Sequence, residues 1–181
     1  MSLPNFISLG RLLAVPVAVW LILSGKFGFA FWVFIAAGIS DAVDGFLAKR
    51  MNAQTELGKV LDPLADKALL VAVYVTLGQA GHLPVWLVIL VVFRDLLIVG
   101  GIILSHTLGR PVRMRPLLVS KLNTGAQIVL AGGILAVLGL GLRVDQLILP
   151  MVWLVAATTA VSGGAYLVTW ARFVTSAGDG N

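Results

Sequence analysis

The sequence predicts an all-α integral membrane protein that forms a single domain over residues 1–181. Of these residues, 59% are hydrophobic and only 12% are charged, whereas soluble domains carry about 25% charged residues. Six apolar segments are close to the roughly 20 residues that a helix needs to cross a bilayer. We therefore expect six transmembrane helices, with membrane lipids as the surrounding solvent.

The first three expected helices cover residues 5–24, 28–49 and 61–79. Gly25 and Lys26 interrupt the apolar pattern between the first helix and the second. The polar residues that follow the second helix indicate a turn or short loop, so the second and third helices should run antiparallel and face each other.

The last three expected helices cover residues 84–106, 120–141 and 147–172. A very short hairpin with Gly81 and Pro84 should connect the third helix to the fourth, because glycine and proline both favour turns. The charged residues Arg143 and Asp145 mark the turn before the last helix.

Basic residues are concentrated in two of the connecting loops. The second-to-third loop carries Lys49, Arg50 and Lys59. The fourth-to-fifth loop carries Arg110, Arg113, Arg115 and Lys121. Because cytoplasmic loops of membrane proteins are enriched in lysine and arginine, both termini should be cytoplasmic. The net charge of +5 fits contact with anionic lipid headgroups better than with nucleic acid.

Location follows from the same features. The first residues lack a basic segment and a small-residue cleavage site, so we expect no removable signal peptide. The expected location is the bacterial inner (cytoplasmic) membrane, with the chain crossing it several times. The absence of cysteine excludes disulfides and thiolate catalysis.

Four aspartates stand beside apolar segments, where charged groups are costly. Asp41 and Asp44 are three residues apart, and Asp62 and Asp66 are four apart. Either spacing places two side chains on one face of a helix. Since a carboxylate at bilayer depth costs at least roughly 2.5–3.5 kcal/mol, four of them together require compensation.

Two bound divalent cations would compensate these charges. Oxygen ligands suit Mg²⁺ or Mn²⁺, and no histidine or cysteine near the cluster favours zinc. Two such ions can bind a phosphoryl group and activate an attacking oxygen. The competing interpretation is that the aspartates cap helices or pair with nearby lysines and arginines. Four carboxylates in two facing pairs make the metal site the better explanation.

The aspartate pattern resembles the signature of the CDP-alcohol phosphotransferases. That signature, Asp-x2-Asp-Gly-x2-Ala-Arg-x8-Gly-x3-Asp-x3-Asp, runs here from Asp41 to Asp66, and all its fixed positions but one are matched. The exception is Lys49, which stands in place of the arginine and is followed at once by Arg50. Lysine keeps the charge but loses the two-pronged geometry of arginine, so either residue could contact the nucleotide phosphate.

Further motifs extend the resemblance over nearly the whole chain. Residues 4–11 are similar to the family's entry into its first helix. Arg94-Asp95, Arg115-Pro116 and the segment 120–124 (Ser-Lys-Leu-Asn-Thr) are most similar to the CMP-forming cardiolipin synthases. Phosphatidylglycerophosphate synthases, the sister group, tend to have Arg-Glu and Gly-Lys-x-Lys-Thr at the corresponding places.

The resemblance implies a homodimer with the CDP-alcohol phosphotransferase fold and a polar cavity open to the cytoplasm. It implies transfer of the phosphatidyl group of CDP-diacylglycerol to an alcohol, with release of CMP. Asp66 would act as the catalytic base. The metal ligands would be Asp41, Asp44, Asp62 and Asp66. The CDP site would be formed by Asp41, Asp44, Gly45, Ala48, Lys49 and Gly58.

The acceptor is expected to be anionic, because cations lie near the same membrane face as the aspartates. Arg94, Arg115 and Lys121 are the candidates for acceptor binding. Phosphatidylglycerol, which gives cardiolipin, is the expected acceptor, and glycerol 3-phosphate is the alternative. A divalent-cation transporter is a remote alternative, since intramembrane acids also mark ion paths. Charges at one end of the helices and the absence of a visible repeat argue against it.

Overall fold

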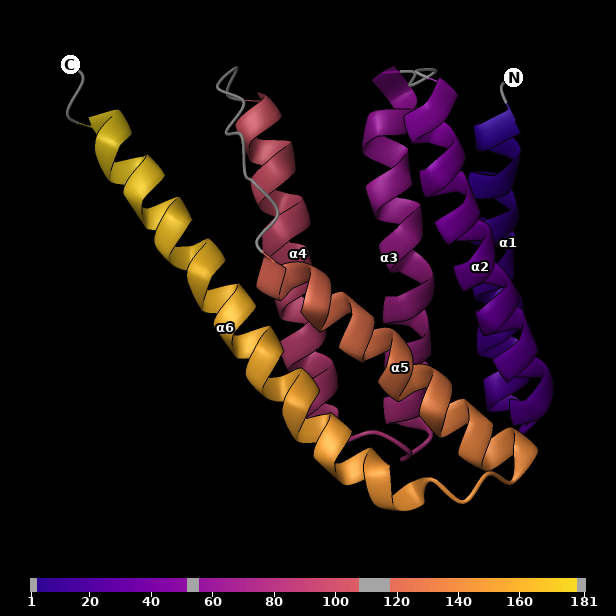
Figure 1. The fold of residues 1–181 in the computed structure, drawn as a ribbon. Helices are drawn as coiled ribbons and strands as arrows, with labels where there is room; N and C mark the ends of the chain where they lie inside the picture. The colour runs from indigo at the N-terminus through magenta and orange to yellow at the C-terminus, as the bar shows by residue number, and fades with distance from the viewer. Residues whose placement is uncertain (1–2, 52–55, 108–117, 179–181) are drawn as a thin grey trace.

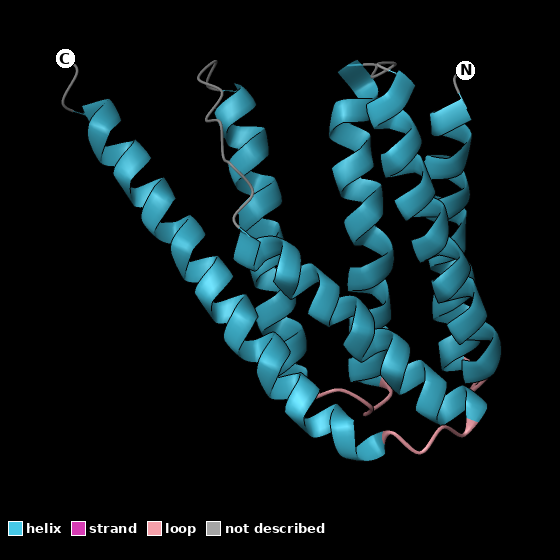
Figure 2. Cartoon of the chain, viewed as in Figure 1, coloured by secondary structure: helices cyan, strands magenta, loops and turns pink. Residues whose placement is uncertain are grey.

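The computed structural model describes residues 3–51, 56–107 and 118–178, and within them the side chains of Gly10 and of residues 12–40, 67–101 and 118–168. Every element in this part of the chain is helical (Figure 2). The six helices are α1 (Leu3–Leu23), α2 (Phe27–Met51), α3 (Glu56–Gln79), α4 (Val85–Thr107), α5 (Leu118–Leu140) and α6 (Asp145–Gly178). The all-helical class and the number of helices in the described ranges agree with the sequence prediction.

Helix ends differ from the prediction mainly where polar residues flank an apolar segment. The third helix begins at Glu56 rather than at residue 61, and the sixth continues to Gly178 rather than ending at 172. Hydropathy identifies only the apolar part of a helix, while the backbone hydrogen bonds continue into the polar turns at its ends. In the described residues, Leu118–Leu140 and Asp145–Val168 are long and apolar enough to cross a membrane.

The helices form two groups that α5 connects (Figure 1). Helix α1 packs against α2 and α3, while α4 packs against both α3 and α6. Helix α5 crosses obliquely between the groups and contacts α2, α3 and α6. Helix α1 begins, and α6 ends, at the same end of the molecule (Figure 1). The buried core contains side chains from all six helices, among them Ile22, Phe34, Leu77, Leu135 and Val155, with Leu87 from α4.

The hairpin between α3 and α4 is confirmed. Gly81 has a φ angle of 79°, a conformation that glycine adopts without the steric cost of a side chain. The amide of His82 donates to the carbonyl of Leu77 at 2.9 Å and closes the turn. Because the connection is so short, α3 and α4 are held antiparallel beside each other.

Helices α2 and α5 approach backbone to backbone where Gly28 meets Gly139. A Cβ atom added to Gly139 would lie 2.5 Å from the Cα of Gly28. We expect Gly139→Ala to destabilise the protein by roughly 1–3 kcal/mol, the usual cost of overpacking. Thermal unfolding in detergent measures this effect. Gly125→Ala on the same helix is the control, because a Cβ there meets nothing within 4 Å; equal unfolding temperatures for both variants would contradict the close approach.

Candidate functional site

The four aspartates lie on two helices that meet at one end of the molecule. Asp41 and Asp44 belong to α2, and Asp62 and Asp66 belong to α3. The end of α2 and the beginning of α3 lie at the same end of the molecule (Figure 1), and only residues 52–55 connect them. Helical backbone at both pairs agrees with the expected one-face arrangement within each pair.

The aspartate side chains lie outside the described residues, so the metal site remains a prediction. The donor set fits the expected ions, since it consists of carboxylate oxygens, which hard divalent cations prefer. Where side chains are described, no other group of three or more histidine, cysteine, aspartate or glutamate residues could hold a metal. The aspartate cluster is therefore the candidate for the metal centre.

The remaining residues predicted for the CDP site lie on the same two helices. Gly45, Ala48 and Lys49 are on α2, and Gly58 is in the first turns of α3. Their side-chain contacts lie outside the described residues, as does the whole of Arg115. Lys121 is on α5 with an exposed side chain.

Arg94 is buried at the junction of α4, α5 and α6. Its residue exposure is 2%. Its Nη1 donates to Asp95 Oδ1 at 2.7 Å, and its Nε and Nη2 donate to Ser162 Oγ at 3.2 and 2.8 Å. Nη2 also donates to Ser120 Oγ. These bonds occupy four of the five N–H donors of a guanidinium, so Arg94 links three helices and has little remaining capacity for a substrate.

Lys67 and Asp95 form an ion pair one residue along α3 from the last of the four aspartates. Lys67 follows Asp66 in α3, and its Nζ donates to Asp95 Oδ1 at 2.8 Å. The Lys67 side chain is 23% exposed, whereas that of Asp95 is 4% exposed. Since Arg94 also contacts this carboxylate, two cations share one anion. This group therefore keeps one net positive charge next to the predicted metal site.

A second polar layer lies farther along the same helices. Asn123 Oδ1 on α5 accepts hydrogen bonds from the hydroxyls of Thr158 and Thr159 on α6, at 2.8 and 2.9 Å. The hydroxyl of Tyr74 on α3 donates to the backbone carbonyl of Gln127 at 3.1 Å. These bonds tie α5 to its neighbours on both sides.

Sequence reasoning missed the role of this polar group. The sequence pattern predicts acceptor binding for Arg94 and no separate role for Asn123 and Gln127, while Lys67 is one of the nearby lysines that could pair with the aspartates. One signal was available, because Lys67 and Asp95 are charged residues next to long apolar segments. The pairing of these two residues could not be predicted, because they are 28 positions apart in the sequence.

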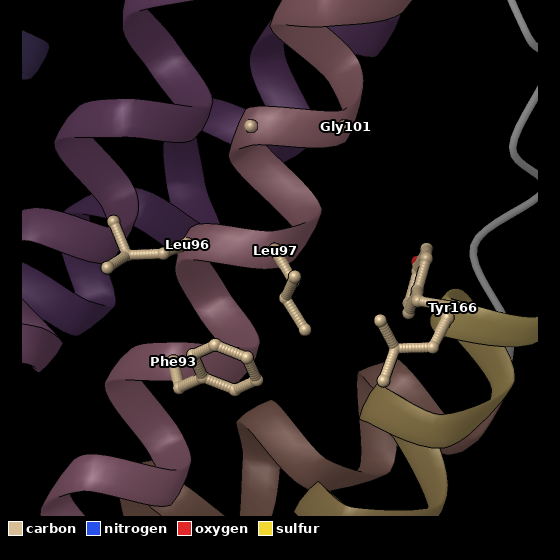
Figure 3. A pocket seen from close by; sticks show the side chains of 7 residues that line it. Phe93, Leu96, Leu97, Gly101 and Tyr166 are labelled. Atoms are coloured by element: carbon tan, nitrogen blue, oxygen red, sulfur yellow. The ribbon is translucent and has the colours of Figure 1, made fainter. Parts of the chain in front are cut away.

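An apolar groove of about 460 Å³ lies between α4 and α6. Figure 3 shows Phe93 and Leu97 of α4 on one side and Tyr166 of α6 on the other. Gly100 and Gly101 also line it. The described lining carries no charged side chain, so this groove is no candidate for phosphate chemistry.

Comparison with known proteins agrees with the site pattern. A family described as CDP-alcohol phosphatidyltransferase matches residues 1–171. A rat protein named cardiolipin synthase (CMP-forming) is 34% identical over 91% of this chain, which spans 60% of that relative's length. A chloroplastic rice protein named CDP-diacylglycerol–glycerol-3-phosphate 3-phosphatidyltransferase 1 is 36% identical over 92% of this chain and 56% of its own length. A Streptomyces coelicolor protein named cardiolipin synthase (CMP-forming) is 38% identical over 59% of this chain and 53% of its own.

Proposed function

Because the chain belongs to the CDP-alcohol phosphatidyltransferase family, we propose that it transfers the phosphatidyl group of CDP-diacylglycerol to phosphatidylglycerol, giving cardiolipin and CMP. The observation that carries this proposal is the family's aspartate pattern from Asp41 to Asp66, divided between two helices that meet at one end of the molecule. The names of the rat and Streptomyces relatives support phosphatidylglycerol as the acceptor.

The proposed reaction is a direct displacement at phosphorus. The acceptor hydroxyl oxygen attacks the phosphorus that carries the diacylglycerol, the bond from that phosphorus to the CMP oxygen breaks, and CMP leaves. Asp66 accepts the proton of the attacking hydroxyl, as a carboxylate beside the reacting oxygen can. Two divalent cations, Mg²⁺ or Mn²⁺, held by Asp41, Asp44, Asp62 and Asp66, would neutralise the pyrophosphate charge.

The remaining residues of the site bind the substrates. Gly45, Ala48 and Gly58 give the CDP group close access to the helices, and Lys49 or Arg50 contacts its phosphate. Arg115 and Lys121 hold the anionic acceptor. Arg94 makes four hydrogen bonds to neighbouring side chains. We therefore infer that it positions the residues around the acceptor site and does not contact the acceptor itself.

The cellular setting is part of the same proposal. The family is membrane-embedded, and we place this chain in the bacterial inner membrane as a homodimer. Each copy would span the bilayer with six helices and keep both termini in the cytoplasm. The aspartate end of α2 and α3 would then face the cytoplasm, where CMP is released.

A second candidate is phosphatidylglycerophosphate synthase, which would use glycerol 3-phosphate. The rice relative, whose name specifies that acceptor, favours it. Both reactions release CMP, and both acceptors carry a phosphate next to a hydroxylated glycerol.

One experiment separates the two reactions. Purified protein is given CDP-diacylglycerol and Mg²⁺ or Mn²⁺, with phosphatidylglycerol or glycerol 3-phosphate offered separately, and the lipid products are resolved by mass. We expect cardiolipin from phosphatidylglycerol. Formation of phosphatidylglycerophosphate without any cardiolipin would overturn the proposal that phosphatidylglycerol is the acceptor. Only the transfer reaction of the family would then stand.

A further inference from the structure

The buried carboxylate of Asp95 has one oxygen that is fully used and one that is not. Oδ1 accepts hydrogen bonds from Lys67 at 2.8 Å and from Arg94 at 2.7 Å. Oδ2 is buried and has no hydrogen-bond partner within the described part of the chain. The residue as a whole is 3% exposed. Since buried polar atoms in native proteins are nearly always hydrogen-bonded, this oxygen is a hydrogen-bond acceptor that still lacks a donor.

The position of the Asp95 carboxylate is fixed by its neighbours. Arg94 bonds to Asp95 while its other donors bond to Ser120 on α5 and Ser162 on α6. Lys67 holds the same oxygen from α3. The carboxylate is therefore held directly by Lys67 on α3 and by Arg94, which is itself bonded to α5 and α6, so its orientation is set before any ligand binds.

Lys67 provides a cation beside the Asp95 carboxylate. Its ammonium group has three donors, of which one bonds to Asp95 in the described structure. The side chain is 23% exposed, so an anion can reach it, unlike the buried Arg94. Lys67 also follows Asp66, the proposed base, in α3, so the two residues belong to the same turn of the helix.

We propose that Lys67 and Asp95 form a subsite for the glycerol phosphate part of the acceptor. The Lys67 ammonium binds the phosphate, and Asp95 Oδ2 accepts a hydrogen bond from the secondary hydroxyl at C2, which does not react. The primary hydroxyl then remains free to approach Asp66. This inference rests on the proposed function, and it applies equally to phosphatidylglycerol and to glycerol 3-phosphate, because both contain these groups.

The first test uses the unaltered protein and two acceptors that lack the C2 hydroxyl. Phosphatidyl-1,3-propanediol is compared with phosphatidylglycerol, and 3-hydroxypropyl phosphate with glycerol 3-phosphate. Each analogue keeps the phosphate and the primary hydroxyl. For whichever acceptor the enzyme uses, we expect kcat/KM of the analogue to be lower than that of the natural acceptor by about tenfold or more. The reason is that hydrogen bonds to charged groups are among the stronger ones. Equal kcat/KM values would overturn the role of Asp95.

Variants assign the effect to the two residues. Asp95→Asn should remove most of the discrimination against the analogues. Lys67→Met should raise the KM of natural acceptor and analogue together by about tenfold, and Lys67→Arg should recover part of the loss. The KM for CDP-diacylglycerol should change little. The control is Asp145→Asn, which neutralises an exposed carboxylate at the start of α6. An unchanged acceptor KM in Lys67→Met would overturn the role of Lys67.

Binding measurements keep this inference separate from the proposed reaction. If no acceptor yields CMP, the proposed function fails, and the subsite is tested by thermal stabilisation instead. Glycerol 3-phosphate should then stabilise the unaltered protein more than 3-hydroxypropyl phosphate, and Lys67→Met should abolish both effects. Equal stabilisation by the two compounds, or stabilisation that survives Lys67→Met, would overturn the subsite. If Asp95→Asn does not fold, the comparison of acceptors and the Lys67→Met variant still test the subsite.

Discussion

Replacing Asp44 or Asp62 with asparagine should lower CMP release by orders of magnitude, while the protein still inserts into membranes. Asparagine keeps the size of the side chain but removes the negative charge that holds a divalent cation. Because two cations together neutralise the pyrophosphate, the loss of one ligand should disrupt the whole site. Asp41→Asn and Asp66→Asn should have effects of the same order. The measurement is CMP release at saturating Mg²⁺ or Mn²⁺ with both substrates present.

The matched control for this prediction is Asp145→Asn. Asp145 is an exposed carboxylate in the first turn of α6, and in the view of Figure 1 that end of α6 lies far from the end where α2 and α3 meet. Its replacement should leave CMP release near that of the unaltered protein. Near-normal activity in Asp44→Asn or Asp62→Asn would contradict the two-metal site.

Replacing Arg94 with leucine should destabilise the protein by about 3–5 kcal/mol, the range found when one partner of a buried ion pair is removed. The change leaves Asp95 with Lys67 as its one charged partner in the described structure, and it removes the donor to Ser120 and Ser162. Arg94→Lys should recover only part of this loss, since an ammonium cannot reproduce the planar arrangement of a guanidinium. Thermal unfolding in detergent measures both variants.

This prediction separates two roles for Arg94. Arg143→Leu is the control, because Arg143 is exposed in the turn before α6 and surface changes usually have small effects. If Arg94→Leu unfolds at the temperature of the unaltered protein but raises the acceptor KM, Arg94 contacts the acceptor directly. If stability falls, Arg94 acts through the packing of α4, α5 and α6.

The sequence by itself determined the class of the fold and the residues of the candidate metal site. Apolar segments identified the helices because a membrane selects for long runs without charge. The aspartates stood out for the same reason, since charged residues are rare where the surroundings are apolar. Each aspartate pair lies within one helix, so the sequence spacing alone predicts that its two members share a helix face. Helix ends were less accurate, as at Glu56 and Gly178, because hydropathy does not mark where helical hydrogen bonding stops.

Only the tertiary structure decided which buried polar groups meet. Arg94 and Ser162 are 68 positions apart and share two hydrogen bonds, and Lys67 pairs with Asp95 across two helices. Sequence periodicity says which face of a helix is polar, but not which partner that face contacts. The partner depends on which helices pack together, and here α4 packs against both α3 and α6. The helix packing therefore gave Lys67 and Asp95 a place beside the candidate site that local pattern does not specify.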